Sequence, residues 1–200
     1  MSTSPSSNWL QWICSSVDSN DLREKYDQWA TTYEVDVADV WKAVPSSAAS
    51  MLAKYVSNKQ ASVLDVGVGT GFVGMALATL GFENLIGLDI SPGMLAQAAK
   101  KQIYHSLLCC SIGDETFATL KKATGVVATG VFAETHAGPA ELDALQTKIK
   151  PGGVLVLTTR QSFLPKLQRV LDQPGWVLLE QKTMPIYDDP MHLLAYQISC

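Results

Sequence analysis

The sequence has little cysteine and histidine, and neither is spaced as in a metal site. The four cysteines, Cys14, Cys109, Cys110 and Cys200, form no Cys-x-x-Cys pair, and the three histidines form no His-x-x-x-His pair. Structural zinc sites depend on such spacings, so we expect no metal. Free thiols are typical of a reducing compartment. Cys109 and Cys110 are predicted to be strand residues that face opposite sides.

The sequence also lacks an excess of positive charge and a long apolar run. Its 15 lysines and arginines and 19 acidic residues give a net charge of −4, so nucleic acid is not an expected partner. No run reaches the roughly 18 apolar residues of a membrane span. No lysine or arginine precedes Arg23, so the charged start of a signal peptide is missing. We expect a cytoplasmic protein, with the nucleus as an alternative, and no contact with a membrane.

The composition predicts one compact domain. The chain has 200 residues, of which 47% are hydrophobic, enough to form a core without disulfides or metal. Residues 1–20 are expected to be a flexible leader that carries Trp9 and Trp12, and residues 21–200 the domain. The domain is predicted to open with a helix capped by Asp21, with Glu24 completing a capping box. Four large side chains recur there at helical spacing and would share one face: Leu22, Tyr26, Trp29 and Tyr33.

Short apolar runs alternate with helical patterns from residue 62 onward. Such alternation predicts an α/β fold, Rossmann-like and doubly wound, with a mostly parallel seven-stranded sheet and helices on both faces. The last two strands follow each other without a helix, so we expect an antiparallel pair at one edge. The predicted strands are 63–66, 85–88, 103–110, 126–129, 154–159, 176–183 and 193–199, and the predicted helices include 46–56, 72–80, 92–102, 140–149 and 164–172.

A glycine-rich turn follows the first predicted strand. Asp65 is followed by Gly67, Gly69 and Gly71 at every second position, and a helix begins directly after them. Glycine lets the backbone turn sharply and approach a ligand. Gly69 to Gly74 also matches the Gly-x-Gly-x-x-Gly pattern of dinucleotide sites. The acidic residue before the turn favours a ligand with an ammonium group instead. Asp89 ends the second strand, where a carboxylate can accept hydrogen bonds from ribose hydroxyls.

These segments resemble the class I methyltransferases that use S-adenosylmethionine (SAM). Val63-Leu-Asp-Val-Gly-Val-Gly-Thr-Gly71 resembles their first motif, and similar segments follow at 88–95 and 150–157. The segments 26–33, 130–132 and 136–139 resemble the methyltransferase-like proteins of the Williams–Beuren region type. The resemblance implies that Tyr26 and Tyr33 close over the cofactor. It also implies cofactor contacts for Asp65, Gly67, Gly69, Gly71, Asp89, Ile90, Met94, Ser111, Ile112 and Val131. Many relatives have an acidic residue where Ser111 stands.

The exit of the fourth strand holds two candidate catalytic residues. Glu134 and His136 would lie near the methyl acceptor, and His136 could act as a general base because its pKa is close to working pH. The alternatives are a histidine with structural hydrogen bonds and a solvated glutamate. The Asn-Pro-Pro-Tyr type of motif found in enzymes that methylate bases or glutamine is missing after this strand. This lowers the expectation of such acceptors.

The sequence therefore predicts transfer of a methyl group from SAM, which leaves S-adenosylhomocysteine, to a small molecule or a protein. One alternative is an NAD(P)-dependent oxidoreductase, although the second half of the chain has no Tyr-x-x-x-Lys pair. The other alternative is a non-catalytic module that binds SAM and acts through partners. The acceptor and the oligomeric state stay open.

Overall fold

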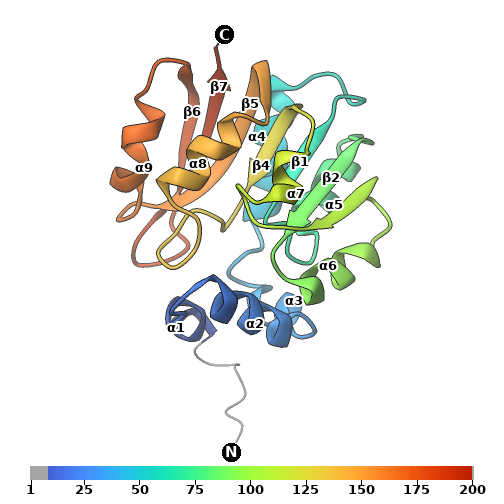
Figure 1. Ribbon diagram of the computed structural model, residues 1–200, viewed down its shortest axis with the longest axis vertical. Coiled ribbons are helices and arrows are strands. Elements are labelled where there is room, and N and C mark those ends of the chain that lie inside the picture. The colour runs from blue at the N-terminus through green and yellow to red at the C-terminus, as the bar shows by residue number, and fades with distance from the viewer. Residues whose placement is uncertain (1–8, 200) are drawn as a thin grey trace, which may run out of the picture.

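The computed structural model describes residues 9–199. A seven-stranded sheet has the strand order β3-β2-β1-β4-β5-β7-β6 (Figure 1). The strands β3, β2, β1, β4 and β5 are parallel, whereas β7 is antiparallel to both β5 and β6. The predicted fold class is confirmed. The strands are β1 (Val63–Val66), β2 (Leu85–Asp89), β3 (Ser106–Cys109), β4 (Ala123–Ala128), β5 (Ile149–Arg160), β6 (Trp176–Met184) and β7 (Met191–Ile198).

Helices cover both faces of the sheet. Val63, Val127 and Val156 of the sheet pack on one face against α4 and α5, and Leu64, Val126 and Leu155 pack on the other against α7, α8 and α9. In Figure 1, α8 and α9 lie in front of the sheet and α4 behind it. This alternation of buried side chains explains why the parallel strands are apolar throughout. The helices are α1 (Trp9–Cys14), α2 (Ser19–Trp29), α3 (Tyr33–Val37), α4 (Val44–Tyr55), α5 (Phe72–Thr79), α6 (Pro92–Ala99), α7 (Glu115–Ala118), α8 (Pro139–Gln146) and α9 (Leu164–Leu171).

The three N-terminal helices form a separate layer at one end of the sheet, next to α6 (Figure 1). The predicted leader contains α1, in which Ile13 is buried and Trp9 lies 5.0 Å from the ring of Trp29 in α2. Residues 1–8 lie outside the described part of the chain. The division of the chain at residue 20 stays a prediction.

Several local predictions need correction. Asp18, not Asp21, caps α2, and its side chain accepts a hydrogen bond from the Asp21 amide. The Asp21 carboxylate instead accepts from the Val17 amide, because the helix begins three residues earlier than predicted. The strand β3 is shorter than expected, whereas β5 runs back through the predicted turn to Ile149. Helices α3 and α7 were not predicted, since four or five residues give no clear period.

Two further findings concern features that the sequence raised. Cys109 is exposed and Cys110 is buried, but only Cys109 belongs to a strand, because β3 ends there. Within residues 9–199, no helix is long and apolar enough to cross a bilayer, and no three His, Cys, Asp or Glu side chains gather as a metal site would require.

Candidate active site

A cavity of about 590 Å³ lies between the N-terminal helices and the carboxyl ends of the parallel strands. This edge of an open α/β sheet is where ligands bind in such folds. Segments from both sides line it: α1, α2 and Trp41 on one side, and the ends of β1, β2, β4 and β5 on the other. Twelve of the residues singled out in the sequence line this cavity: Tyr26, Tyr33, Gly67, Gly69, Asp89, Ile90, Met94, Ser111, Ile112, Val131, Glu134 and His136.

The glycine turn presents bare backbone to this cavity. Gly67 and Gly69 have φ angles of 64° and 53°, the left-handed region that favours glycine. A Cβ on Gly69 would meet no atom within 4 Å, whereas one on Gly67 would collide with Val131. The turn therefore leaves room for a ligand at Gly69 and packs closely against the β4 exit at Gly67.

The later glycines of the pattern serve packing. Gly71 and Gly74 do not line the cavity, and a Cβ on Gly74 would collide with the ring of Tyr104. The Tyr104 hydroxyl donates a hydrogen bond to Asp65, with an O–O distance of 2.6 Å. The apparent dinucleotide fingerprint thus ends in a site for a tyrosine ring, and Gly71 is placed outside the ligand cavity.

Asp65 is almost fully buried and lies outside the cavity lining. Burial raises the pKa of its carboxyl to about 7, and the hydrogen bond from Tyr104 opposes that rise. Its carboxyl is therefore held by Tyr104, which lies just before the first residue of β3. The structure places Asp65 behind the glycine turn and outside the cavity lining. The sequence had instead predicted a carboxylate next to the ligand.

Asp89 is placed to bind a ligand. It is 9% exposed, lines the cavity and accepts hydrogen bonds from the amides of Gly69 and Ser91, at 2.8 and 2.9 Å. Burial raises its pKa to about 6, although those backbone amides lower it. The carboxylate is thus rigidly oriented, and its remaining acceptor capacity is available to a ligand.

Thr70 supplies a second polar group at the cavity, and its hydroxyl has no hydrogen-bond partner among the described residues. Its hydroxyl is buried, lines the cavity and, with the indole nitrogen of Trp176, is one of two buried side-chain polar atoms in the described chain without a hydrogen bond. Buried polar groups are normally hydrogen-bonded. A polar ligand lying along the glycine turn would remove this deficit.

The N-terminal layer is fastened over the cavity by Asp27. The Asp27 carboxylate accepts hydrogen bonds from the Ser91 hydroxyl at 2.6 Å and the Gly93 amide at 2.8 Å. Both partners lie at the start of α6, directly after Asp89. This contact keeps Tyr26 and Tyr33 of the N-terminal layer at the cavity, and burial raises the pKa of each of these tyrosines.

His136 lies at the opposite wall with both ring nitrogens engaged. Nδ1 is 3.0 Å from the backbone oxygen of Glu134, which can only accept, so Nδ1 carries the proton. Nε2 therefore accepts from the Tyr26 hydroxyl at 2.9 Å. Burial lowers the pKa of His136, and the nearby charge of Arg160 acts in the same direction. The ring is neutral and can take up a proton at Nε2.

Glu134 faces away from this arrangement. Its carboxylate forms an ion pair with Lys166 of α9, and its side chain is 64% exposed. Glu134 lines the cavity, whereas Lys166 does not. The structure therefore gives Glu134 a solvated ion pair, the alternative that the sequence left open.

A comparison with protein families shows to which family the chain belongs. A family described as a methyltransferase domain matches residues 40–189 of the chain. The chain belongs to the SAM-dependent methyltransferases. Human methyltransferase-like protein 27 is 35% identical over 146 residues, which are 70% of this methyltransferase chain and 59% of that protein. The malonyl-[acyl-carrier protein] O-methyltransferase of Priestia megaterium is 24% identical over 140 residues, 69% of this chain and 50% of that protein. The chain spans about half to three-fifths of the length of these two relatives.

Solved structures share the fold of this methyltransferase. Magnesium protoporphyrin IX methyltransferase of Synechocystis, crystallised with SAM, superposes with a TM-score of 0.66 at 16% identity, over 98% of this chain and 93% of that chain. The 1,6-didemethyltoxoflavin-N1-methyltransferase of Burkholderia thailandensis superposes with a TM-score of 0.65 at 15% identity, over 88% and 87%.

The cavity of this methyltransferase also includes residues to which the sequence analysis gave no role in the site. Trp9 and Ile13 come from α1, Trp41 precedes α4, and Arg160 and Tyr187 come from the end of β5 and the β6–β7 connection. Two tryptophans in the leader were the one signal that could have indicated α1. No local pattern marks Arg160 or Tyr187, because only the strand pairing brings them to the cavity.

Proposed function

We propose that the protein transfers a methyl group from SAM to an acceptor that is a small molecule or a protein side chain. The observation that carries this proposal is the buried Asp89 carboxylate, held by two backbone amides beside the open Gly69. SAM supplies a methyl group activated by its sulfonium. The protein's task is then to hold an acceptor atom in line with that methyl and to keep water out.

The residues around the glycine turn fit the cofactor. Asp89 would accept hydrogen bonds from the ribose hydroxyls, as carboxylates at this strand position do, and Thr70 would gain the partner that its hydroxyl lacks. Met94 is buried and lines the cavity between Ile90 and the β3 exit, where Ser111 and Ile112 would flank the adenine. Asp114 does not replace an acidic residue there, because its carboxylate binds the Ser111 and Phe117 amides and caps α7.

His136 is the group that would take the acceptor's proton. Its neutral Nε2 faces the cavity side occupied by Tyr26, and its pKa is lowered by burial, so it is unprotonated at neutral pH. An acceptor must replace Tyr26 at this nitrogen before proton transfer. Glu134 is a weaker candidate because Lys166 neutralises it.

We further assign the chain to the methyltransferase-like proteins of the Williams–Beuren region type. The support is the 35% identity to human methyltransferase-like protein 27 and the segments 26–33 and 136–139. These segments carry Tyr26, Tyr33 and His136, which all line the cavity.

Thermal unfolding with SAM, S-adenosylhomocysteine, NAD and NADPH in parallel tests the cofactor. A ligand at about 100 times its Kd stabilises by roughly 2.7 kcal/mol, which is several degrees for such a domain. We expect a shift with SAM and S-adenosylhomocysteine alone. A shift with NAD or NADPH alone would contradict the proposal.

Turnover needs a second experiment, with acceptor candidates and SAM labelled at the methyl group. His136→Ala should retain the SAM-induced thermal shift and lose methyl transfer. A protein that binds SAM and labels none of a broad acceptor set would support the non-catalytic alternative. Full activity of His136→Ala across the pH range would remove His136 as a base.

A further inference from the structure

The cavity wall contains a cation whose charge no carboxylate neutralises. Arg160 ends β5, lines the cavity and is partly buried. Residues 9–199 form six ion pairs in which a side-chain nitrogen lies within 4.0 Å of a carboxylate oxygen, and Arg160 takes part in none of them. A guanidinium placed in an apolar wall without a counter-charge is unfavourable in the free protein.

The acids around the same cavity are all engaged elsewhere. Asp89 binds the amides of Gly69 and Ser91, Glu134 pairs with Lys166, and Glu141 accepts from the Gly138 amide at the start of α8. None of them is directed at Arg160. Asp188, the neighbour of Tyr187 in the chain, is exposed, and none of the six ion pairs of the described residues includes it. Arg160 is therefore available to a carboxylate that a ligand brings.

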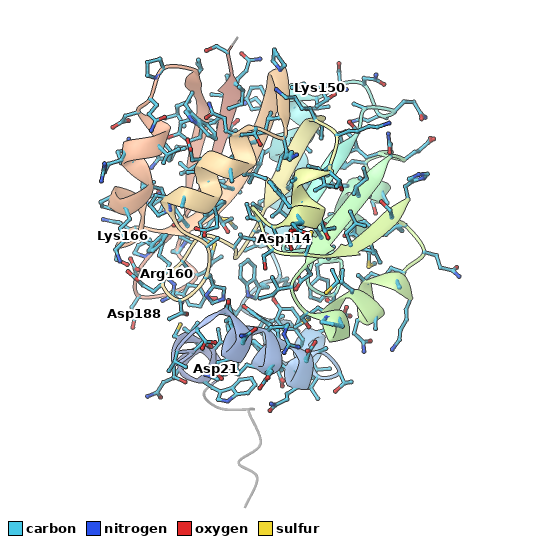
Figure 2. The ribbon with its side chains drawn as sticks, in the orientation of Figure 1. Asp21, Asp114, Lys150, Arg160, Lys166 and Asp188 are labelled. Carbon is cyan, nitrogen blue, oxygen red and sulfur yellow. The ribbon has the colours of Figure 1, made fainter. Side chains whose placement is uncertain are left out.

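The guanidinium is held in place although it has no ion pair. It lies over the ring of Tyr187, 4.5 Å from the ring centre, a cation–π contact that fixes its plane. Its backbone is paired with Met191 in the sheet. Figure 2 shows Arg160 at the opposite end of β5 from Lys150, on the side of the N-terminal helices. A positioned guanidinium matches a carboxylate through two parallel hydrogen bonds.

Several aromatic side chains line the cavity together with Arg160. Trp9, Tyr26, Trp29, Trp41, Phe163 and Tyr187 line the same cavity. Aromatic walls favour flat apolar ligands. One guanidinium in such surroundings suits a single negative charge better than a doubly charged phosphate.

We propose that the methyl acceptor is a small apolar or aromatic molecule with a carboxylate that docks on Arg160. This inference rests on the proposed function, because it assigns the substrate class of the same site. The anion has a second effect. Since the Arg160 charge lowers the pKa of His136, a bound carboxylate raises that pKa and makes His136 a stronger base only when the acceptor is present.

Isothermal titration calorimetry with matched ligand pairs tests the proposal. The probes are 2-naphthoate against 2-naphthamide, indole-3-acetate against indole-3-acetamide, and 2-naphthyl phosphate. We expect at least one carboxylate to bind about tenfold or more tightly than its amide, the range of a charged hydrogen-bond pair, and more tightly than the phosphate. Arg160→Gln should abolish this preference, and Arg160→Lys should restore part of it.

Arg169→Gln is the matched control, because it removes the same charge from an exposed position in α9 outside the cavity. It should bind like the wild type, and unfolding curves should show that all three variants fold. A second readout is the NMR titration of His136, whose pKa should rise with the carboxylate in the wild type but not in Arg160→Gln.

Three results would overturn the proposal: no carboxylate is preferred over its amide, the phosphate is preferred over the carboxylates, or the preference survives in Arg160→Gln. The titrations need no SAM, so they are independent of the cofactor experiment. A protein that fails to bind SAM but keeps the Arg160-dependent preference would sink the proposed function and leave the anion site standing.

Discussion

The hydroxyl of Tyr26 and the Nε2 atom of His136 lie 2.9 Å apart, although 110 positions separate the two residues in the chain. Tyr26 belongs to α2 in the N-terminal layer, and His136 follows β4. The hydrogen bond therefore joins the two sides of the cavity directly. It also covers the nitrogen at which an acceptor's proton would arrive, so the closed N-terminal layer and a bound acceptor compete for the same atom.

Tyr26→Phe removes the donor to Nε2. That bond stabilises the neutral imidazole, so its loss should raise the pKa of His136, which burial otherwise lowers. The charged groups near the ring, Arg160 and the Glu134–Lys166 pair, are unchanged in the variant. Proton NMR of the three histidine rings across pH measures the shift, and Tyr55→Phe, which loses a hydroxyl bonded to Glu180 on β6, is the control. An unaltered or lowered His136 pKa would contradict the assigned hydrogen bond.

Asp89→Ala should weaken SAM binding by one or more orders of magnitude. It removes a carboxylate that we expect to accept charged hydrogen bonds worth roughly 1.5–3 kcal/mol. It also frees the Gly69 and Ser91 amides. Asp89→Asn keeps the size of the side chain, so it separates the effect of the lost charge on binding from the effect of the lost shape. Calorimetry with S-adenosylhomocysteine checks both variants, and wild-type affinity in both would take Asp89 out of the site.

Asp65→Asn should change how stability depends on pH. Burial raises the folded pKa of Asp65 from 3.8 to about 7. The stability gained from the protonated form is thus complete below pH 3.8 and is lost as the pH rises through 7. The variant has no such loss, so relative to wild type it should gain roughly 2–4 kcal/mol between pH 4 and pH 8.

Urea unfolding at pH 4, 6 and 8 measures this gain for Asp65→Asn. Asp143→Asn, on an exposed position of α8, should run parallel to the wild type. Parallel behaviour of Asp65→Asn as well would mean that burial in the surrounding core does not raise the pKa of this carboxyl.

Asp27→Ala should loosen the N-terminal layer without unfolding the sheet. The variant loses the hydrogen bonds from Ser91 and Gly93 and the ion pair with Arg23. Hydrogen bonds to a charged group are worth roughly 1.5–3 kcal/mol, so opening of α1 and α2 should become at least about tenfold more frequent. Hydrogen exchange followed by mass spectrometry should show faster exchange in residues 9–29 and unchanged exchange in β4 and β5. Asp39→Ala, an exposed carboxylate after α3, is the control.

The fold class and the cofactor end of the site could be predicted from the sequence because their signals are local. The strand–glycine–helix pattern around Gly67 and Gly69 needs positive φ angles that other residues rarely adopt. Asp89 ends its strand next to that turn in any parallel β1–β2 arrangement. Alternating strands and helices leave few topologies, since crossovers between parallel strands are right-handed.

Apart from Glu134 and His136, the proposed acceptor end was decided by tertiary structure. Arg160 and Tyr187 meet only because β7 inserts between β5 and β6, and α1 becomes part of the cavity only because its tryptophans pack on Trp29. Asp65 is held by Tyr104 from the next βα unit. Such contacts join residues that are far apart in the chain, and their energies depend on packing, which no local period encodes. The sequence by itself determined the chain's fold and the glycine turn beside Asp89, where we propose that the cofactor binds. Only the tertiary structure brought Arg160, Tyr187 and α1 to the cavity, because their contacts depend on packing between distant segments.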